Sequence, residues 1–299
     1  MNKLRLLKIH NACVSGGPNC IPDEIRWLNW HGYPSKFLPE SFEAEKLVCL
    51  KLQCSRIIQL WKGIKLVDKL KFIDLSHSRK LIRTPDFTRI PNLVRLILED
   101  CSSLTEIHPS EGHLKRLQLL NLRNCRNLRG LPKQIFLERP EVMILSGCSK
   151  VDEFPEILGT MNCVIEVYME ATSIKELYPS AFEHMPSLVL LNLSYCKNLT
   201  SLPISICRLK FIKALILSGC SKLDKLSEEL GQIESFQELC GDETAISELP
   251  STFLLLKNLK ILSFRGLKER HLKLGVYLLG CYEKNVKIQG AWLFHQSQD

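Results

Sequence analysis

Leucine and other large apolar residues recur along this chain in a fixed order with a period of 23 to 24 residues. The order is clearest in four segments: LVRLILEDCSSLTEI from Leu93, LQLLNLRNCRNLRGLP from Leu117, LVLLNLSYCKNLTSLP from Leu188 and IKALILSGCSKLDKL from Ile212. All four read L-x-x-L-x-L-x-x-C-x-x-L-x-x-L, where L stands for leucine or isoleucine. This period indicates a repeat architecture, because one such unit is too small to bury its own apolar face.

The cysteine position of this pattern forms a column of small residues that fixes the register of the repeats. In steps of 23 or 24 residues, the column contains Ser55, Ser78, Cys101, Cys125, Cys148, Thr172, Cys196, Cys220 and Thr244. Weaker copies of the repeat begin at Leu4, Ile25, Val164, Phe236 and Leu259. We therefore predict about twelve units over residues 1–267 and a non-repeat tail over residues 268–299.

The L-x-L spacing within each unit predicts a short strand. Residues two apart on an extended segment point to the same side, and the residue between them points to the other. Successive strands then stack in parallel, and segments such as SICRLKFI return the chain through 3₁₀ or short helical turns. The predicted fold is an α/β solenoid, a leucine-rich-repeat horseshoe with a parallel β-sheet on its concave face.

The column residue follows each strand, where the chain turns inward and leaves backbone amides and carbonyls buried. A small side chain with hydrogen-bonding capacity suits that place, so the column is predicted to be a structural ladder. The alternative is that its cysteines bind a metal or act as nucleophiles. Because no C-x-x-C pair occurs and the histidines are dispersed, we predict no metal site.

Charge is distributed unevenly along the 299 residues, of which 45% are apolar and 24% charged. Residues 1–150 carry 25 Lys and Arg against 14 Asp and Glu, whereas residues 151–299 carry 15 against 18. The basic residues of the first half are scattered singly among leucines and form none of the basic runs that mark nucleic-acid binding. We therefore expect an acidic protein partner and no nucleic acid.

The 13 cysteines are an odd number, and five of them occupy one repeat position, which pairwise disulfides do not explain. Reduced thiols are the expected state. The N-terminus has no apolar stretch of signal-peptide length, and no run of 18 apolar residues occurs in the chain. We therefore expect a cytoplasmic or nuclear location and no membrane contact.

Motifs for catalysis or nucleotide binding are absent from the sequence. It contains no G-x-x-x-x-G-K-[ST], G-x-G-x-x-G, H-E-x-x-H or G-x-S-x-G. We expect no catalytic residue and no cofactor. Two other classes stay open: a stand-alone interaction adaptor of the same fold, and an enzyme such as a ubiquitin ligase with a cysteine nucleophile, which a thiol-reactive probe would detect.

Function is expected from the exposed strand positions, because the core does not dictate their identity. The candidate protein-binding residues are Lys51, Gln53, Phe72, Asp74, His77, Arg95, Glu99, Asp100, Asn121, Arg123, Glu166, Tyr168, Glu170, Asn192 and Tyr195.

From about residue 2 to 267, the sequence resembles the leucine-rich-repeat region of plant TIR-NB-LRR disease-resistance receptors of the tobacco mosaic virus resistance type. The matching strings are IPDEIRWLNWHGYPSKFLPESFEAEKLVCLKL, SRIIQLWKGIKLVDKLKFIDLSHSRKLIRTPDFTRIPNLVRLILEDCSSLTEIHPS and LLNLSYCKNLTSLP. The resemblance implies a role in defense signalling, in which the repeats sense a pathogen effector or its host target. It also implies that they restrain the nucleotide-binding switch domain of the same receptor.

This chain departs from the family pattern because it contains no TIR domain and no nucleotide-binding domain. NAD cleavage and ADP or ATP binding, which the resemblance assigns to those domains, are therefore not expected of these residues. Met1 falls at the first repeat, which suggests a fragment or a truncated gene product.

Overall fold

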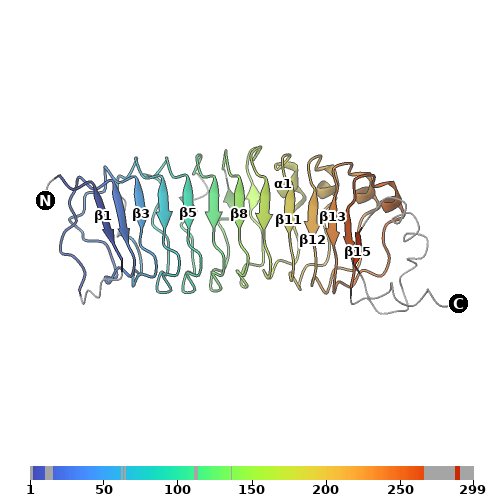
Figure 1. The fold of residues 1–299 in the computed structure, drawn as a ribbon, viewed down its shortest axis with the longest axis horizontal. Coiled ribbons are helices and arrows are strands. Elements are labelled where there is room, and N and C mark those ends of the chain that lie inside the picture. Colours follow the sequence, from blue (N-terminus) through green and yellow to red (C-terminus); the bar gives the residue numbers. More distant parts are fainter. Residues whose placement is uncertain are drawn as a thin grey trace. The chain divides into compact units, whose positions relative to one another are not determined.

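The computed structural model describes residues 3–10, 16–61, 63, 65–110, 114–135, 137–265 and, for the main chain, 287–289. Its contacts divide the chain into two units, Met1–Cys163 and Val164–Asp299, which are described separately below. In each unit, short parallel strands follow one another in chain order (Figure 1).

Unit 1 contains one parallel sheet in which each strand pairs with the strand of the next repeat. Its strands are β1 (Leu6–Ile9), β2 (Trp27–Trp30), β3 (Cys49–Lys51), β4 (Phe72–Asp74), β5 (Arg95–Ile97), β6 (Leu119–Asn121) and β8 (Val142–Ile144). Two return segments form a second, two-stranded parallel sheet from β7 (Gln134–Ile135) and β9 (Glu156–Ile157).

Unit 2 continues the same construction. Its strands are β10 (Glu166–Tyr168), β11 (Leu190–Asn192), β12 (Ala214–Ile216), β13 (Glu238–Cys240), β14 (Ile261–Ser263) and β15 (Lys287–Gln289). Its return segments form α1 (Pro179–Glu183) and the 3₁₀ helices η2 (Ile204–Arg208), η3 (Glu228–Gln232) and η4 (Ser251–Leu255). Strand β15 lies in the tail predicted over residues 268–299; the rest of that tail lies outside the described residues.

Each three-residue strand from β3 to β14 contains the first leucine position of L-x-L as its inward residue, between two outward ones. The middle residue of each of these strands is almost fully buried, as with Leu96 in unit 1 and Leu191 in unit 2. Burial of each such side chain contributes about 1.5–3 kcal/mol to folding. The predicted leucine-rich-repeat solenoid with a parallel sheet is therefore confirmed.

The column residues are buried beside the strand ends and connect neighbouring repeats through one repeated hydrogen bond. The Cys125 thiol donates to the carbonyl of Leu98, 3.2 Å away in the preceding repeat. The same donation runs from Ser78 to Leu52, Cys101 to Leu75, Cys148 to Leu122, Cys196 to Met169 and Cys220 to Leu193, at 2.9–3.2 Å.

Four of these accepting carbonyls, those of Leu75, Leu98, Leu122 and Leu193, also accept the backbone N–H of the column residue in their own repeat. For Leu98, this second donor is the N–H of Cys101, at 3.1 Å. Both lone pairs of a buried carbonyl are thereby satisfied. Thr244 departs from this pattern because its hydroxyl donates to the Gly241 carbonyl in its own repeat, at 2.7 Å.

Substitution of Cys125 tests this ladder. Cys125→Val fills the volume of the thiol but removes its donor, so the free energy of unfolding should fall by about 1–2 kcal/mol. Cys125→Ser retains a donor, as Ser78 does, and should cost less than about 1 kcal/mol. Denaturant unfolding of both variants provides the measurement; an equal loss for both would show that the hydrogen bond is not what stabilises the turn.

Candidate functional site

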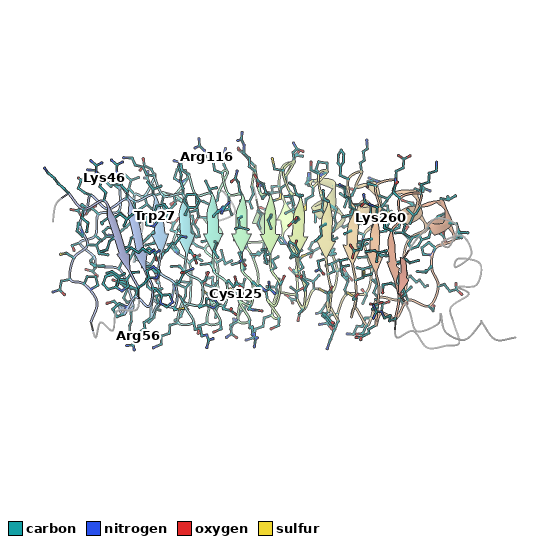
Figure 2. All side chains as sticks on the ribbon, viewed as in Figure 1. Trp27, Lys46, Arg56, Arg116, Cys125 and Lys260 are labelled. Carbon is teal, nitrogen blue, oxygen red and sulfur yellow. The ribbon has the colours of Figure 1, made fainter. Side chains whose placement is uncertain are left out.

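The outward residues of the strands form a surface that we call the strand face: in each unit, the first and third positions of every strand. In unit 1, the first positions are aligned in register and contain Leu6, Trp27, Cys49, Phe72, Arg95, Leu119 and Val142. Figure 2 shows Trp27 beside the strands, Lys46 and Arg116 at the edge where the strands begin, and Arg56 at the edge where they end.

Several predicted binding residues hydrogen-bond one another across neighbouring repeats. The Gln53 amide donates to Asp74 at 2.8 Å, and the Asn192 amide donates to Glu170 at 2.7 Å. The Asn121 amide donates to Glu99 over a longer 3.4 Å. In each pair, the third residue of one strand meets the residue two positions after the preceding strand. We call these contacts braces.

The same Asp and Asn side chains also fold back onto their own main chain. Asp74, Asn121 and Asn192 each accept the N–H two residues ahead at 2.9–3.1 Å, which is an Asx turn. Asp74 also accepts the Ser76 hydroxyl and is only 7% exposed. The expectation that Asp74 is an exposed binding residue is therefore wrong, because its carboxylate is covered by these local bonds.

Four further predicted residues pair locally. His77 lies 3.2 Å from Asp100, and the Tyr168 hydroxyl donates to Glu166 at 3.0 Å. Burial and the Glu166 carboxylate raise the pKa of Tyr168. With the braces, ten of the fifteen predicted residues bond another of the fifteen. Among the described residues, no side-chain hydrogen bond or ion pair is found for the other five, which are Lys51, Phe72, Arg95, Arg123 and Tyr195.

The sequence analysis missed two prominent residues of the strand face. Leu6 is 57% exposed and Trp27 is 40% exposed, and they pair in register on β1 and β2. The signal was present in the sequence, since LRLLKIHN and IRWLNW place Leu6 and Trp27 at the strand position that Phe72 and Arg95 hold in later repeats.

The column cysteines are poor nucleophiles in this fold. Burial raises the pKa of Cys101 and of Cys220 to about 12, and the pKa of Cys125 is raised by its contact with Cys148 and by burial. A thiol at neutral pH is then almost entirely protonated, whereas the thiolate is the reactive form. The ladder cysteines should therefore react slowly with electrophiles.

His108, Ser110 and Asp86 come together in unit 1, but not in the arrangement of a catalytic triad. His108 Nδ1 lies 2.7 Å from the Ser110 hydroxyl and 3.9 Å from Asp86, so one ring nitrogen faces both groups. A general base between an acid and a nucleophile would use two different ring nitrogens. Among the described residues, no group of His, Cys, Asp and Glu is arranged to hold a metal ion, and no helix is long and apolar enough to cross a membrane.

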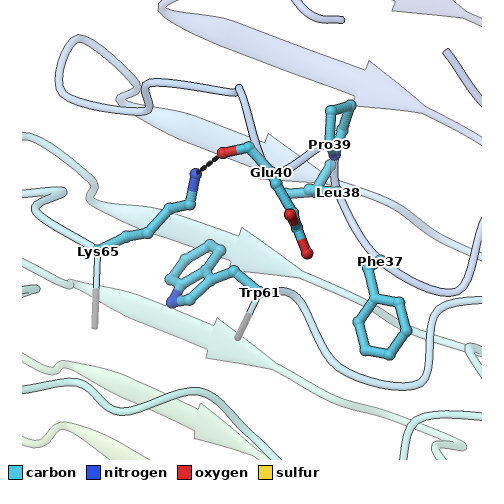
Figure 3. Close-up of a pocket in the computed structure, with 6 residues that line it drawn as sticks. All are labelled: Phe37, Leu38, Pro39, Glu40, Trp61 and Lys65. Carbon is cyan, nitrogen blue, oxygen red and sulfur yellow. Dashed lines mark hydrogen bonds between the residues drawn. The ribbon is translucent and has the colours of Figure 1, made fainter. Parts of the chain in front are cut away.

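A pocket of about 390 Å³ lies on the return segments of unit 1, away from the strand face. It is lined by Phe37, Leu38, Pro39, Glu40, Trp61 and Lys65 (Figure 3). The Lys65 ammonium donates to the main-chain carbonyls of Glu40, at 3.2 Å, and Phe42. Because Trp61 is only 3% exposed, the indole offers little surface to a ligand.

The rate of thiol labelling at each cysteine tests whether the ladder thiols are unreactive, and with it the alternative that the protein is an enzyme with a cysteine nucleophile. Near neutral pH, the exposed Cys20, Cys54 and Cys163 should react with iodoacetamide at least about a hundredfold faster than Cys101 or Cys125 in the folded protein. Site-resolved mass spectrometry gives the rates. A ladder cysteine that reacts as fast as Cys54 would contradict this prediction and restore the case for a nucleophile.

Tyr195 occupies a strained turn whose geometry depends on a glycine in the next repeat. Tyr195 has φ +59°, Gly219 has φ +80°, and a Cβ at Gly219 would lie 2.5 Å from the Tyr195 ring. Gly219→Ala should therefore lower the free energy of unfolding by about 1–2 kcal/mol. In a Tyr195→Ala background the loss should be smaller, since only the backbone strain remains; equal losses in a double-mutant cycle would exclude the ring contact.

The sequence of this chain is similar to those of several plant disease resistance proteins. Residues 136–240 match the family model described as disease resistance protein RPS4B-like, leucine-rich repeats. The chain is 36% identical to TMV resistance protein N of Nicotiana glutinosa over 90% of its own length and 23% of that protein. It is 34% identical to disease resistance protein RPS4B of Arabidopsis thaliana over 84% of its length and 20% of that protein. The chain thus spans about a quarter or less of these relatives.

Solved structures agree on the fold. The leucine-rich repeat domain of the type III effector XopL matches with TM-score 0.51 and 19% identity, over 76% of this chain and 71% of that one. A chain of the Drosophila Toll–Spatzle complex matches with TM-score 0.56 and 15% identity, over 81% of this chain and 38% of that one. The repeats and their parallel strands show a leucine-rich-repeat fold, and over most of its length the sequence is similar to plant disease resistance proteins that include RPS4B and TMV resistance protein N.

Proposed function

We propose that this chain is the ligand-sensing and autoinhibitory repeat segment of an intracellular plant immune receptor, and that it acts by protein binding. The observation that carries the proposal is the strand face. Five of its predicted residues have no side-chain partner among the described residues: three cations and two aromatic rings. Arginine and aromatic side chains are enriched at protein interfaces, whereas lysine is not. The relatives named above support the immune role.

Two partners follow from the proposal. One is a pathogen effector or the host protein that it modifies, and the other is the nucleotide-binding switch domain of the same receptor. The excess of 25 Lys and Arg over 14 Asp and Glu in residues 1–150 favours an acidic surface as the second partner. No cofactor and no catalytic step are assigned to these residues in the proposal.

Charge reversal on the strand face tests the second partner. Lys51→Glu, Arg95→Glu and Arg123→Glu together should weaken binding to the cognate switch domain by about tenfold or more at low salt. The effect should shrink as salt rises, because exposed charges are screened. Affinity can be measured by calorimetry with the full chain and the purified domain.

Arg116→Glu provides the matched control. Arg116 is exposed and basic but lies at the edge where the strands begin (Figure 2), so its reversal should leave the affinity unchanged. If the triple variant binds the switch domain as tightly as the wild type at low salt, the proposed contact is discarded.

A further inference from the structure

We infer that the strand face of β1–β5 binds an acidic segment of a partner protein that places an apolar side chain over Trp27. The inference rests on the proposed function, since it assumes that the strand face is the binding surface, and it adds the position of a site and the chemistry of its occupant.

The first observation is an exposed apolar cluster. Leu6 and Trp27 are neighbours in register and are 57% and 40% exposed, and Phe72 is partly exposed two strands further on. Cys49 lies between Trp27 and Phe72 in the register and is fully buried. Large apolar side chains gathered on the surface of a soluble protein mark interaction sites, and tryptophan is enriched where binding energy concentrates.

The second observation is the charge around this cluster. Lys8 and Lys51 follow the apolar row on β1 and β3, Lys71 precedes β4, and Arg95 continues the row on β5. No ion pair joins these four cations to another described residue. Asp74 is the only acid at the first and third positions of β1–β5, and the Gln53 brace and Ser76 already occupy its carboxylate.

The two observations define the occupant by complementarity. Carboxylates on the partner would meet the four cations, and a leucine or aromatic side chain between them would cover Leu6 and Trp27. Strands about 4.8 Å apart give five strands a width of roughly 20 Å, which matches about six residues of extended chain. A short acidic and apolar segment therefore fits the area.

A protein segment fits better than the other anions that a basic patch attracts. Single-stranded nucleic acid uses cations in a continuous track together with aromatic platforms, whereas these cations flank an apolar row that contains the aliphatic Leu6. An amphipathic anchor for anionic lipid would need a broad apolar face beside many cations. Both remain outcomes of the experiment below.

The experiment uses the full chain and three fluorescent peptides of about eight residues each. The first peptide combines Asp with Leu and Phe, the second replaces Leu and Phe by Ser, and the third replaces Asp by Lys. The first should bind at least about ten times more tightly than the other two in fluorescence anisotropy, and increasing salt should weaken it.

Variants locate the site. Trp27→Ala should weaken the first peptide by about tenfold or more, and the pair Lys51→Glu with Lys71→Glu should do the same. Phe211→Ala and Lys213→Glu are the matched controls, because they remove an exposed aromatic ring and reverse an exposed cation in unit 2. These controls should not change the affinity. Thermal unfolding of every variant separates lost binding from lost folding.

Three results would overturn the inference: equal binding of all three peptides, tighter binding of an oligouridine or of phosphatidylserine vesicles, or no effect of the folded Trp27→Ala variant. The proposed function fails separately. If the acidic and apolar peptide binds at Trp27 but the Lys51, Arg95 and Arg123 reversals leave the switch domain bound, the site stands and the autoinhibitory contact does not. If instead the peptide does not bind at Trp27 but the three charge reversals release the switch domain, the site is discarded and the autoinhibitory contact stands.

Discussion

One hydrogen bond recurs where the repeats of this protein meet: at six of the nine column positions the side chain donates to the backbone carbonyl that follows the strand of the preceding repeat. Cys125 and Leu98 show it in unit 1, and Cys220 and Leu193 show it in unit 2. A buried carbonyl left unsatisfied would cost about 1–3 kcal/mol at every turn. Because the donor must be small, the column accepts only Cys, Ser or Thr across nine repeats.

The ladder lies at the strand ends and does not occupy the strand face, but some side chains of that face are already hydrogen-bonded to one another. Braces such as Asn192 with Glu170 join polar side chains of neighbouring repeats by hydrogen bonds. These residues therefore stabilise the strand face in addition to forming part of its surface. A substitution there would change folding and binding together. The side chains without such bonds, above all Trp27, Phe72, Lys51 and Arg95, are those whose identity the fold does not explain.

The sequence predicted the strands, the column and the short helical returns because each depends on local spacing: L-x-L marks a strand, and a small residue after it marks the inward turn. The braces could not be predicted, since they depend on which side chains of neighbouring repeats meet, 21 or 22 residues apart in the sequence. Asp74 illustrates the limit, because its position is outward while its carboxylate is covered by Gln53 and Ser76. Leu6 and Trp27 could have been found, as their strand position was readable from the repeat pattern.

The most direct test is amide hydrogen exchange, because it reports whether the strand pairing, which the column bond supports at six positions, holds neighbouring repeats together. The account predicts slow exchange at the buried centres of β5, β6, β11 and β12, that is at Leu96, Leu120, Leu191 and Leu215, and faster exchange in the exposed return segments. Exchange at these four amides as fast as in an unstructured peptide would contradict it.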